Sequence, residues 1–188
     1  MDPIAIILFV GLAVIAVVMV YTRTATNIIA ADNKCNDAWK AVELQLRERG
    51  ELVAQLEEMM GANHEALLAL RDARAEVDAA MDAEKKPEDV MVVSDELTTA
   101  LRQIFSVVER STALMTNPDL VAHLSEIANA ENRIGKARGE YNDRAREYNN
   151  MVTGFPGEKV AGFRYRPRKK LEPRESGDGE RELPWAKF

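Results

Sequence analysis

Cysteine is nearly absent from this sequence, since Cys35 is the single thiol among 188 residues. A lone cysteine excludes an internal disulfide and any zinc site built from several thiolates, so nothing indicates an oxidising compartment. The chain also has only ten glycines, seven prolines and an aromatic content of 6%. This scarcity disfavours sheets joined by tight turns, whereas the abundance of Ala, Leu, Glu and Arg favours helices. We therefore expect an all-α protein with one domain, a membrane segment and a tail.

Several motifs that carry chemistry are missing from the chain. It has no glycine-rich phosphate loop, no nucleophile elbow and no His-Glu-x-x-His sequence. Two pairings of histidine with glutamate occur, His64 with Glu65 and His123 with Glu126, but no second recognisable pair faces them, which disfavours a di-iron bundle. We therefore expect a protein without enzymatic activity, without a cofactor and without a bound metal.

Charged residues are absent from residues 3–22, and residues 4–20 are almost wholly aliphatic. At about 1.5 Å per residue, this segment is about 30 Å long, which equals the thickness of the hydrocarbon core of a bilayer. A cleaved signal peptide would place basic residues before a shorter apolar core, whereas Asp2 stands there. Residues 1–22 are therefore predicted to be a retained, single-pass transmembrane anchor.

The positions of the basic residues around this segment predict its orientation. Arg23, Lys34 and Lys40 follow the apolar segment, and no Lys or Arg precedes it. Basic residues beside a membrane helix resist translocation. We therefore expect a cell-membrane protein with its amino terminus outside and its helical domain in the cytoplasm.

Residues 23–157 are predicted to form an antiparallel bundle of about four long soluble helices. No Gly or Pro occurs in residues 21–49, so the membrane helix is expected to continue directly into the first soluble helix. Apolar residues alternate four and three apart, which is typical of coiled-coil packing. In the first soluble helix this seam consists of Cys35, Trp39, Val42, Leu46, Arg49, Val53, Leu56 and Met60. In the last one it consists of Leu120, Leu124, Ile127, Glu131, Ile134, Arg138, Tyr141, Ala145, Tyr148 and Val152.

Breaks between the helices follow from capping residues and prolines. Residues 61–63 interrupt the first soluble helix, and Asn63 is a suitable cap for the second, which is expected to end near Pro87. Ser94 suits the start of the third helix, which is expected to run to Met115. The turn at residues 117–119 separates it from the last helix, because proline is tolerated in a first helical turn.

Five polar residues lie on or beside these apolar seams. Arg49, Glu131 and Arg138 occupy seam positions, and Asn142 and Asn149 flank the last seam. One interpretation is that they pair with one another and fix the register of the helices, since a buried charge needs a partner. The other interpretation is a polar pocket or ligand site between the helices.

The balance of charge changes after the body of the chain. Residues 23–152 hold 16 basic and 24 acidic side chains, whereas residues 153–188 hold 9 and 6. Six basic residues of this last region could contact lipid: Lys159, Arg164, Arg166, Arg168, Lys169 and Lys170. Anionic lipid attracts each nearby basic residue by about 1 kcal/mol. The alternative is a solvated tail, and residues 158–188 are expected to be largely disordered.

The last helix also carries a family resemblance. Residues 130–142, AENRIGKARGEYN, followed by Tyr148-Asn149 and Phe155-Pro156, resemble the signature of the LemA family. Weaker similarities at residues 38–49 and 63–65 extend the resemblance over roughly residues 22–163. It implies an amino-terminal membrane helix, a small external amino end and a helical bundle, with no established biochemical activity. Ala54 departs from the proline that is frequent in the family, and the segment before Asn117 lacks the usual aromatic-Pro pattern.

These observations favour a scaffold or adaptor that holds partner proteins at a membrane. A lipid-binding or membrane-shaping protein that uses the basic tail, and a ligand sensor that uses the polar stripe of the last helix, are alternatives. The expected partners are membrane lipid and an unidentified protein, with self-association left open. Nucleic acid is not expected, because the body is acidic and contains no recognised binding module.

Overall fold

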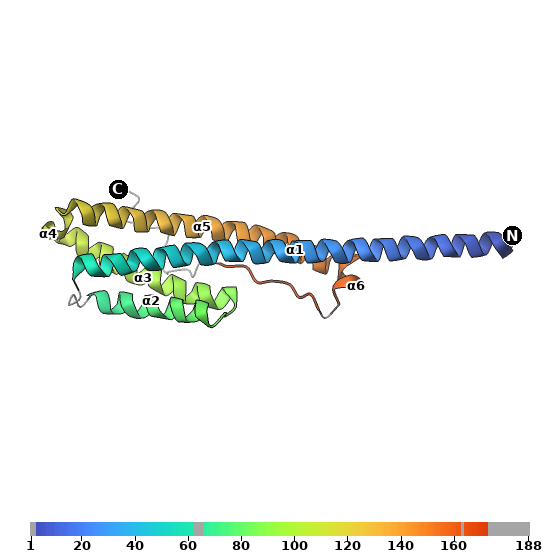
Figure 1. The fold of residues 1–188 in the computed structure, drawn as a ribbon, viewed down its shortest axis with the longest axis horizontal. Coiled ribbons are helices and arrows are strands. Elements are labelled where there is room, and N and C mark those ends of the chain that lie inside the picture. Colours follow the sequence, from blue (N-terminus) through green and yellow to red (C-terminus); the bar gives the residue numbers. More distant parts are fainter. Residues whose placement is uncertain (1–2, 62–65, 163, 173–188) are drawn as a thin grey trace. The chain divides into compact units, whose positions relative to one another are not determined.

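The computed structural model describes residues 3–61, 66–162 and 164–172 of the chain. Every regular element in these ranges is a helix (Figure 1). The helices are α1 (Pro3–Met60), α2 (Ala66–Asp82), α3 (Pro87–Arg110), α4 (Thr112–Met115), α5 (Pro118–Thr153) and α6 (Gly157–Ala161). The predicted all-α class is thereby confirmed.

The first helix joins the apolar segment to the first soluble helix without a break, as predicted. It contains 58 residues, which corresponds to about 87 Å at the usual rise. Its apolar residues 4–20 are exposed throughout, whereas Ile28, Cys35 and Val42 further along are fully buried. The helix ends where Gly61 adopts a φ of 80°, a conformation that glycine adopts without steric cost. The predicted cap Asn63 lies outside the described residues.

The third helix begins seven residues earlier than predicted, at Pro87 instead of Ser94. Pro87 stands in the first turn, where its missing N–H costs no hydrogen bond, and Glu88 and Asp89 favour the positive end of the helix dipole. The extra turns bury Val90. The prediction failed because proline was interpreted only as the end of α2.

The third helix also ends earlier than predicted, at Arg110 instead of Met115. Ser111 has extended backbone angles, and the short helix α4 follows it. The predicted start of α5 is confirmed, because the Asn117 side-chain oxygen accepts hydrogen bonds from the backbone N–H groups of Asp119 and Leu120. The helix α5 ends at Thr153, close to the predicted end at Val152.

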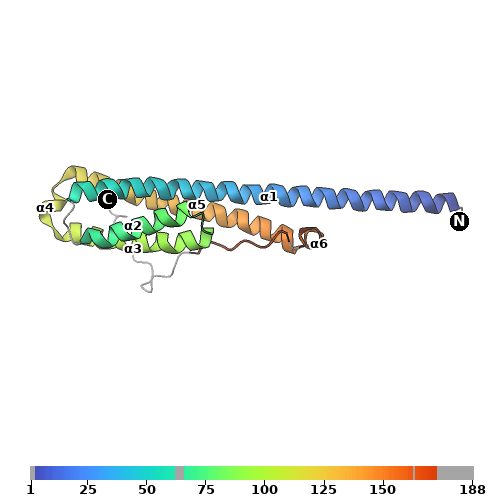
Figure 2. The same cartoon turned by 60° about the horizontal axis from the view of Figure 1, so that its bottom comes forward.

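The chain divides into two compact units, and α1 and α5 contribute to both. The first unit comprises residues 1–38 and 142–170, and the second comprises residues 39–141 and 171–188. In the second unit the parts of α1, α2, α3 and α5 run alternately up and down (Figures 1 and 2). This arrangement is the antiparallel bundle that the sequence predicts.

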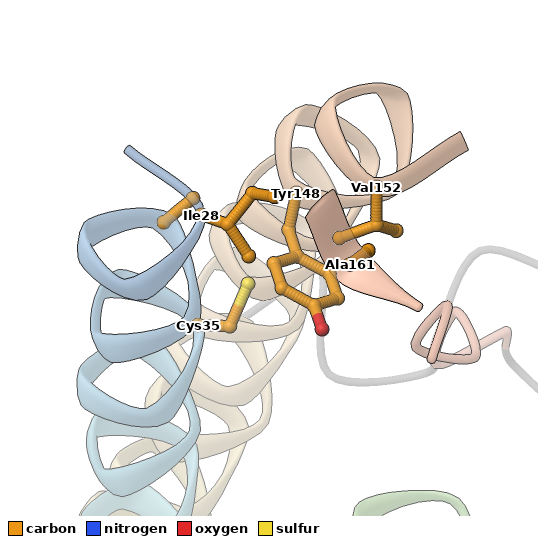
Figure 3. Packing of buried hydrophobic residues seen from close by; sticks show 6 residues of the cluster. Ile28, Cys35, Tyr148, Val152 and Ala161 are labelled. Atoms are coloured by element: carbon orange, nitrogen blue, oxygen red, sulfur yellow. The ribbon is translucent and has the colours of Figure 1, made fainter. Parts of the chain in front are cut away.

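The predicted seams form much of the core of the second unit and part of the core of the first. In the second unit, the buried seam residues include Val42, Leu46, Val53, Leu56, Leu120, Leu124, Ile127 and Ile134. In the first unit, the core consists of Ile28, Ala31, Cys35, Tyr148, Val152 and Ala161. Figure 3 shows the Tyr148 ring pointing from α5 into the space between α1 and α6. The burial of apolar surface along these seams supplies the main driving force for the packing of the helices.

The predicted disordered tail differs from the structure at its amino end. Residues 157–161 form α6, and Ala161 is buried in the core of the first unit. Residues 164–172 follow without regular secondary structure, and we call this segment the strap. The composition of this region suggested solvation, but Ala161 and Tyr165 pack with residues from the middle of α1 and the end of α5. The remainder of the predicted tail, residues 173–188, lies outside the described residues.

Candidate functional site

The most deeply buried polar group in the second unit is the guanidinium of Arg49, whose side chain is fully buried on α1. Its Nη1 donates to Glu131 Oε1 at 2.7 Å and to Thr98 Oγ1 at 3.0 Å. Its Nη2 donates to Ser94 Oγ at 2.9 Å. We call these four residues the Arg49 network. It joins α1, α3 and α5 at one level of the bundle.

Helical spacing brings these side chains together. Arg49 and Glu131 stand at seam positions of α1 and α5, as predicted, and Ser94 and Thr98 are one turn apart on α3. The Glu131 side chain is 12% exposed, so the ion pair is largely removed from water. A buried charge pair of this kind is strongly destabilised by loss of one partner, because the other charge remains without compensation. The geometry therefore suits the fixing of helix register.

The other predicted polar residues do not join this network. Arg138 donates to Asp95 Oδ1 at 2.7 Å and forms a separate ion pair between α5 and α3. Asn142 and Asn149 belong to the first unit, and both are half-buried. The stripe is therefore divided among several local contacts.

In the first unit, Asn149 binds the strap through a pair of hydrogen bonds. Its Nδ2 donates to the Arg168 carbonyl oxygen, and its Oδ1 accepts from the Arg168 backbone N–H, both at 2.8 Å. One side chain thus satisfies both backbone groups of Arg168, as a neighbouring β-strand would. The strap is fixed at this residue.

The Arg168 side chain is engaged as well. Its Nη2 donates to Asp32 Oδ1 and to Asn36 Oδ1, each at 2.7 Å, and its guanidinium lies over the Tyr148 ring, 5.6 Å from the centroid. Asp32 and Asn36 are one turn apart on α1, so they present two acceptors to a single guanidinium. Arg168 therefore links α1, α5 and the strap and is not available to lipid in this arrangement.

Burial raises the pKa values of two side chains beside Arg168. Burial raises the pKa of the Cys35 thiol above its ordinary value, and Arg168 opposes this effect. Burial likewise raises the pKa of the Tyr148 phenol, and the negative charge of Asp32 adds to the increase. Both groups are therefore held in their neutral forms, and the thiol is a poor nucleophile.

The remaining predicted lipid-facing residues lie on the surface of the first unit. Lys159 pairs with Glu158 at 3.2 Å, with both side chains well exposed, and Arg164 lies beside the Tyr165 ring. Arg166, Lys169 and Lys170 are also exposed. These five residues are accessible at the surface, in contrast to Arg168.

Sequence reasoning missed the partners of the predicted polar residues. Ser94 was interpreted as the start of α3, so Ser94 and Asp95 were not recognised as partners. The role of Thr98 depends on the rotation of α3 in the bundle. Asp32 and Asn36 share one face of α1, but no seam position marked them. The spacing of Asp32 and Asn36, one turn apart beside a buried cysteine, was the available signal.

Glu57 was missed as well, although it stands next to the seam residue Leu56. It is buried on α1 and accepts hydrogen bonds from Arg71 and Arg74 on α2, each at 3.1 Å. Its role is thus the joining of α1 to α2.

The structure describes one of the two histidines that the sequence singles out. His64 lies outside the described residues. His123 Nε2 lies 2.7 Å from the Leu52 carbonyl oxygen, which assigns it to a backbone contact between α5 and α1. Within the described ranges no group of three or more His, Cys, Asp or Glu residues is placed to hold a metal ion.

The fold and these contacts define a class of protein, an all-helical bundle whose first helix carries a long apolar end. Among residues 3–61, 66–162 and 164–172, α1 is the one helix long and apolar enough to cross a membrane, and its most apolar part is wholly unburied. The sequence profile of the LemA family matches residues 38–188, which is most of the chain. The chain therefore belongs to the LemA family. None of the curated proteins compared with it is significantly similar.

Proposed function

We propose that this chain is a membrane-anchored scaffold that holds partner proteins at the cytoplasmic face of the cell membrane. One observation carries the proposal: α1 is a single helix whose residues 4–20 are exposed and apolar, and whose later turns enter the helical bundle. An exposed apolar stretch of this length needs a lipid environment. The same helix would then present the bundle beside the membrane.

The interior of the second unit supports a non-catalytic role. Arg49 bonds to Glu131 and to the hydroxyl groups of Ser94 and Thr98, so the fully buried charge of Arg49 is neutralised inside the bundle. A catalytic acid or base instead requires contact with a substrate in a cleft. A ligand sensor built on the polar stripe is accordingly less favoured than a scaffold.

Lipid binding through basic residues is a second proposed function. It is supported by the exposure of Lys159, Arg164 and Arg166 in the same unit as the part of α1 that follows the apolar segment. Exposed basic groups near a membrane are attracted to anionic lipid.

Proximity labelling in cells would test the scaffold proposal. A labelling enzyme is fused to either terminus of the full chain, and the control fusion carries residues 1–37 joined to an unrelated helical domain. We expect the carboxyl-terminal fusion to label a reproducible set of cytoplasmic proteins that the control does not label. Identical sets from the two fusions would contradict the proposal, and labelling of external proteins by the carboxyl-terminal fusion would contradict the orientation.

A further inference from the structure

The turn between α5 and α6 presents an aromatic side chain that is almost fully exposed. Phe155 is 88% exposed, and Met151, one turn earlier on α5, is 42% exposed. Exposed single apolar residues are common, but an almost fully exposed phenylalanine beside a second apolar residue suits contact with an apolar medium.

The core of the first unit places this turn close to the end of the apolar segment. The position of a Cβ at Gly157 would be 3.8 Å from Ile28 Cδ1, and Val152 and Ala161 pack in the same core as Ile28. Ile28 is six residues beyond Thr22, which is about 9 Å along α1. Figures 1 and 2 both show α6 beside α1, at the carboxyl end of α5.

The charges around the turn match an anionic surface. Lys159, Arg164 and Arg166 are exposed, and Glu158 is the one acidic residue in residues 154–170. The Lys159–Glu158 pair is exposed on both sides and contributes little, so Lys159 remains able to contact another anion. An aromatic ring flanked by basic residues is the usual composition of a surface that binds at the lipid–water interface.

We propose that the α5–α6 turn is a second membrane contact, in which Phe155 inserts among the headgroups of anionic lipid and Lys159, Arg164 and Arg166 bind the phosphates around it. This inference rests on the proposed anchoring of α1. Two contacts, α1 and the turn, then fix the orientation of the first unit on the membrane. Lipid is favoured over a protein partner because Gly157 packs on Ile28, which is about 9 Å along α1 from the predicted boundary of the bilayer core.

The experiment places tryptophan at the turn of the full chain and reconstitutes it in vesicles that contain brominated lipid. The variant is Phe155→Trp, and the matched control is Leu44→Trp, an exposed apolar position on α1 that is 24 residues, or about 36 Å, beyond Val20. The wild-type chain gives the background from Trp39 and Trp185. Because Phe155 is exposed, the substitution leaves the core intact, and far-UV circular dichroism checks the fold.

In vesicles that contain anionic lipid, we expect bromolipid quenching of the added tryptophan to be at least twofold greater in Phe155→Trp than in Leu44→Trp. Adding Lys159→Glu and Arg164→Glu to Phe155→Trp should remove more than half of this excess, and so should vesicles of zwitterionic lipid alone. Both results would support the inference.

Equal bromolipid quenching in the two variants, with equal quenching by aqueous iodide, would overturn the inference while leaving the anchor intact. Protection of the added tryptophan from iodide that increases with the ratio of protein to lipid, without bromolipid quenching, would also overturn the inference. The turn would then be covered by a second copy of the chain. Release of the wild-type chain from the vesicles by an alkaline wash would overturn the anchoring and this inference together.

Discussion

Arg49 carries a positive charge at a position without access to water, and Glu131 balances it at 2.7 Å. The variant Arg49→Met removes the cation and leaves the carboxylate largely buried with no opposite charge. We expect the free energy of unfolding to decrease by about 3–5 kcal/mol, the usual cost of breaking a buried ion pair. Urea denaturation of the full chain in mild detergent, followed by circular dichroism, measures the decrease.

Two controls separate this effect from loss of an ordinary surface charge. Arg133→Met removes an exposed arginine whose ion pair with Glu48 spans 3.4 Å, and its effect should remain within about 0.5 kcal/mol. The double variant Arg49→Met with Glu131→Met should recover most of the loss, because no charge is then left alone. A double variant no more stable than Arg49→Met would contradict the interpretation.

Cys35 is buried, and its pKa is raised by burial, so its thiol should be unreactive in the folded chain. We expect alkylation by iodoacetamide at pH 8 to be at least about tenfold slower than in urea.

Cys35 and Tyr148, with ordinary pKa values of 9.0 and 10.0, both have raised pKa values in the fold. Their contribution to stability is therefore complete below pH 9 and is lost as the pH rises through the raised values. Rapid alkylation at pH 8, or stability that increases above pH 9, would contradict this account.

Part of the polar chemistry could be predicted from the sequence at the scale of residues. The alternating spacing of four and three placed Arg49 and Glu131 on facing seams, and a buried charge needs a partner. The hydroxyl groups of Ser94 and Thr98 could not be predicted, because their orientation depends on the rotation of α3 in the bundle. Arg168 was misinterpreted as a free basic residue, since nothing local in the sequence indicates its pairing with Asp32, 136 residues away.

At the scale of elements, Gly157 allows α6 to pack closely against the end of α5. A Cβ at this residue would be 1.8 Å from the Met151 carbonyl oxygen, so the backbone would have to move. We expect Gly157→Ala to lower the free energy of unfolding by about 1–3 kcal/mol, a typical cost of overpacking. The matched control is Gly139→Ala in the interior of α5, where a Cβ meets nothing within 4 Å. That variant should gain about 0.5–1 kcal/mol, because glycine weakens a helix. Denaturation curves that show the two substitutions to be equivalent would contradict this packing.

The strap is attached to α5 through Asn149. Asn149→Leu removes both hydrogen bonds to the Arg168 backbone, so the N–H of Arg168 should exchange with solvent faster, by about tenfold for a loss of 1.4 kcal/mol. Hydrogen exchange followed by mass spectrometry over the strap measures the change. Asn150→Leu, at an exposed neighbouring position, is the control and should leave the rate unchanged. Equal rates in the wild type and Asn149→Leu would show that other contacts fix the strap.

The helices themselves could be predicted better than their ends. Apolar periodicity located α1, α2 and α5, and the Asn117-Pro118 turn marked the start of α5, because these signals are local. Pro87 is compatible with two local structures, the end of one helix or the first turn of the next. Only the burial of Val90 in the bundle distinguishes them. The packing of α6 on Ile28 depends on contacts more than 120 residues apart along the chain, which no local pattern contains.

At the scale of the whole molecule, one continuous helix has two environments. Residues 4–20 of α1 are apolar and exposed, whereas Ile28 and the later seam residues of the same helix are buried. Both the proposed scaffold and the proposed lipid contact at Phe155 require that residues 4–20 remain in the mature protein and lie in a bilayer. Loss of that part would remove the basis of both proposals without altering the bundle.

Alkaline carbonate extraction of cell membranes, followed by intact-mass measurement of the chain, tests this claim most directly. We predict that the chain stays in the membrane pellet and that its mass includes residues 3–22. A carbonate-soluble chain whose mass corresponds to a start beyond Thr22 would contradict the account.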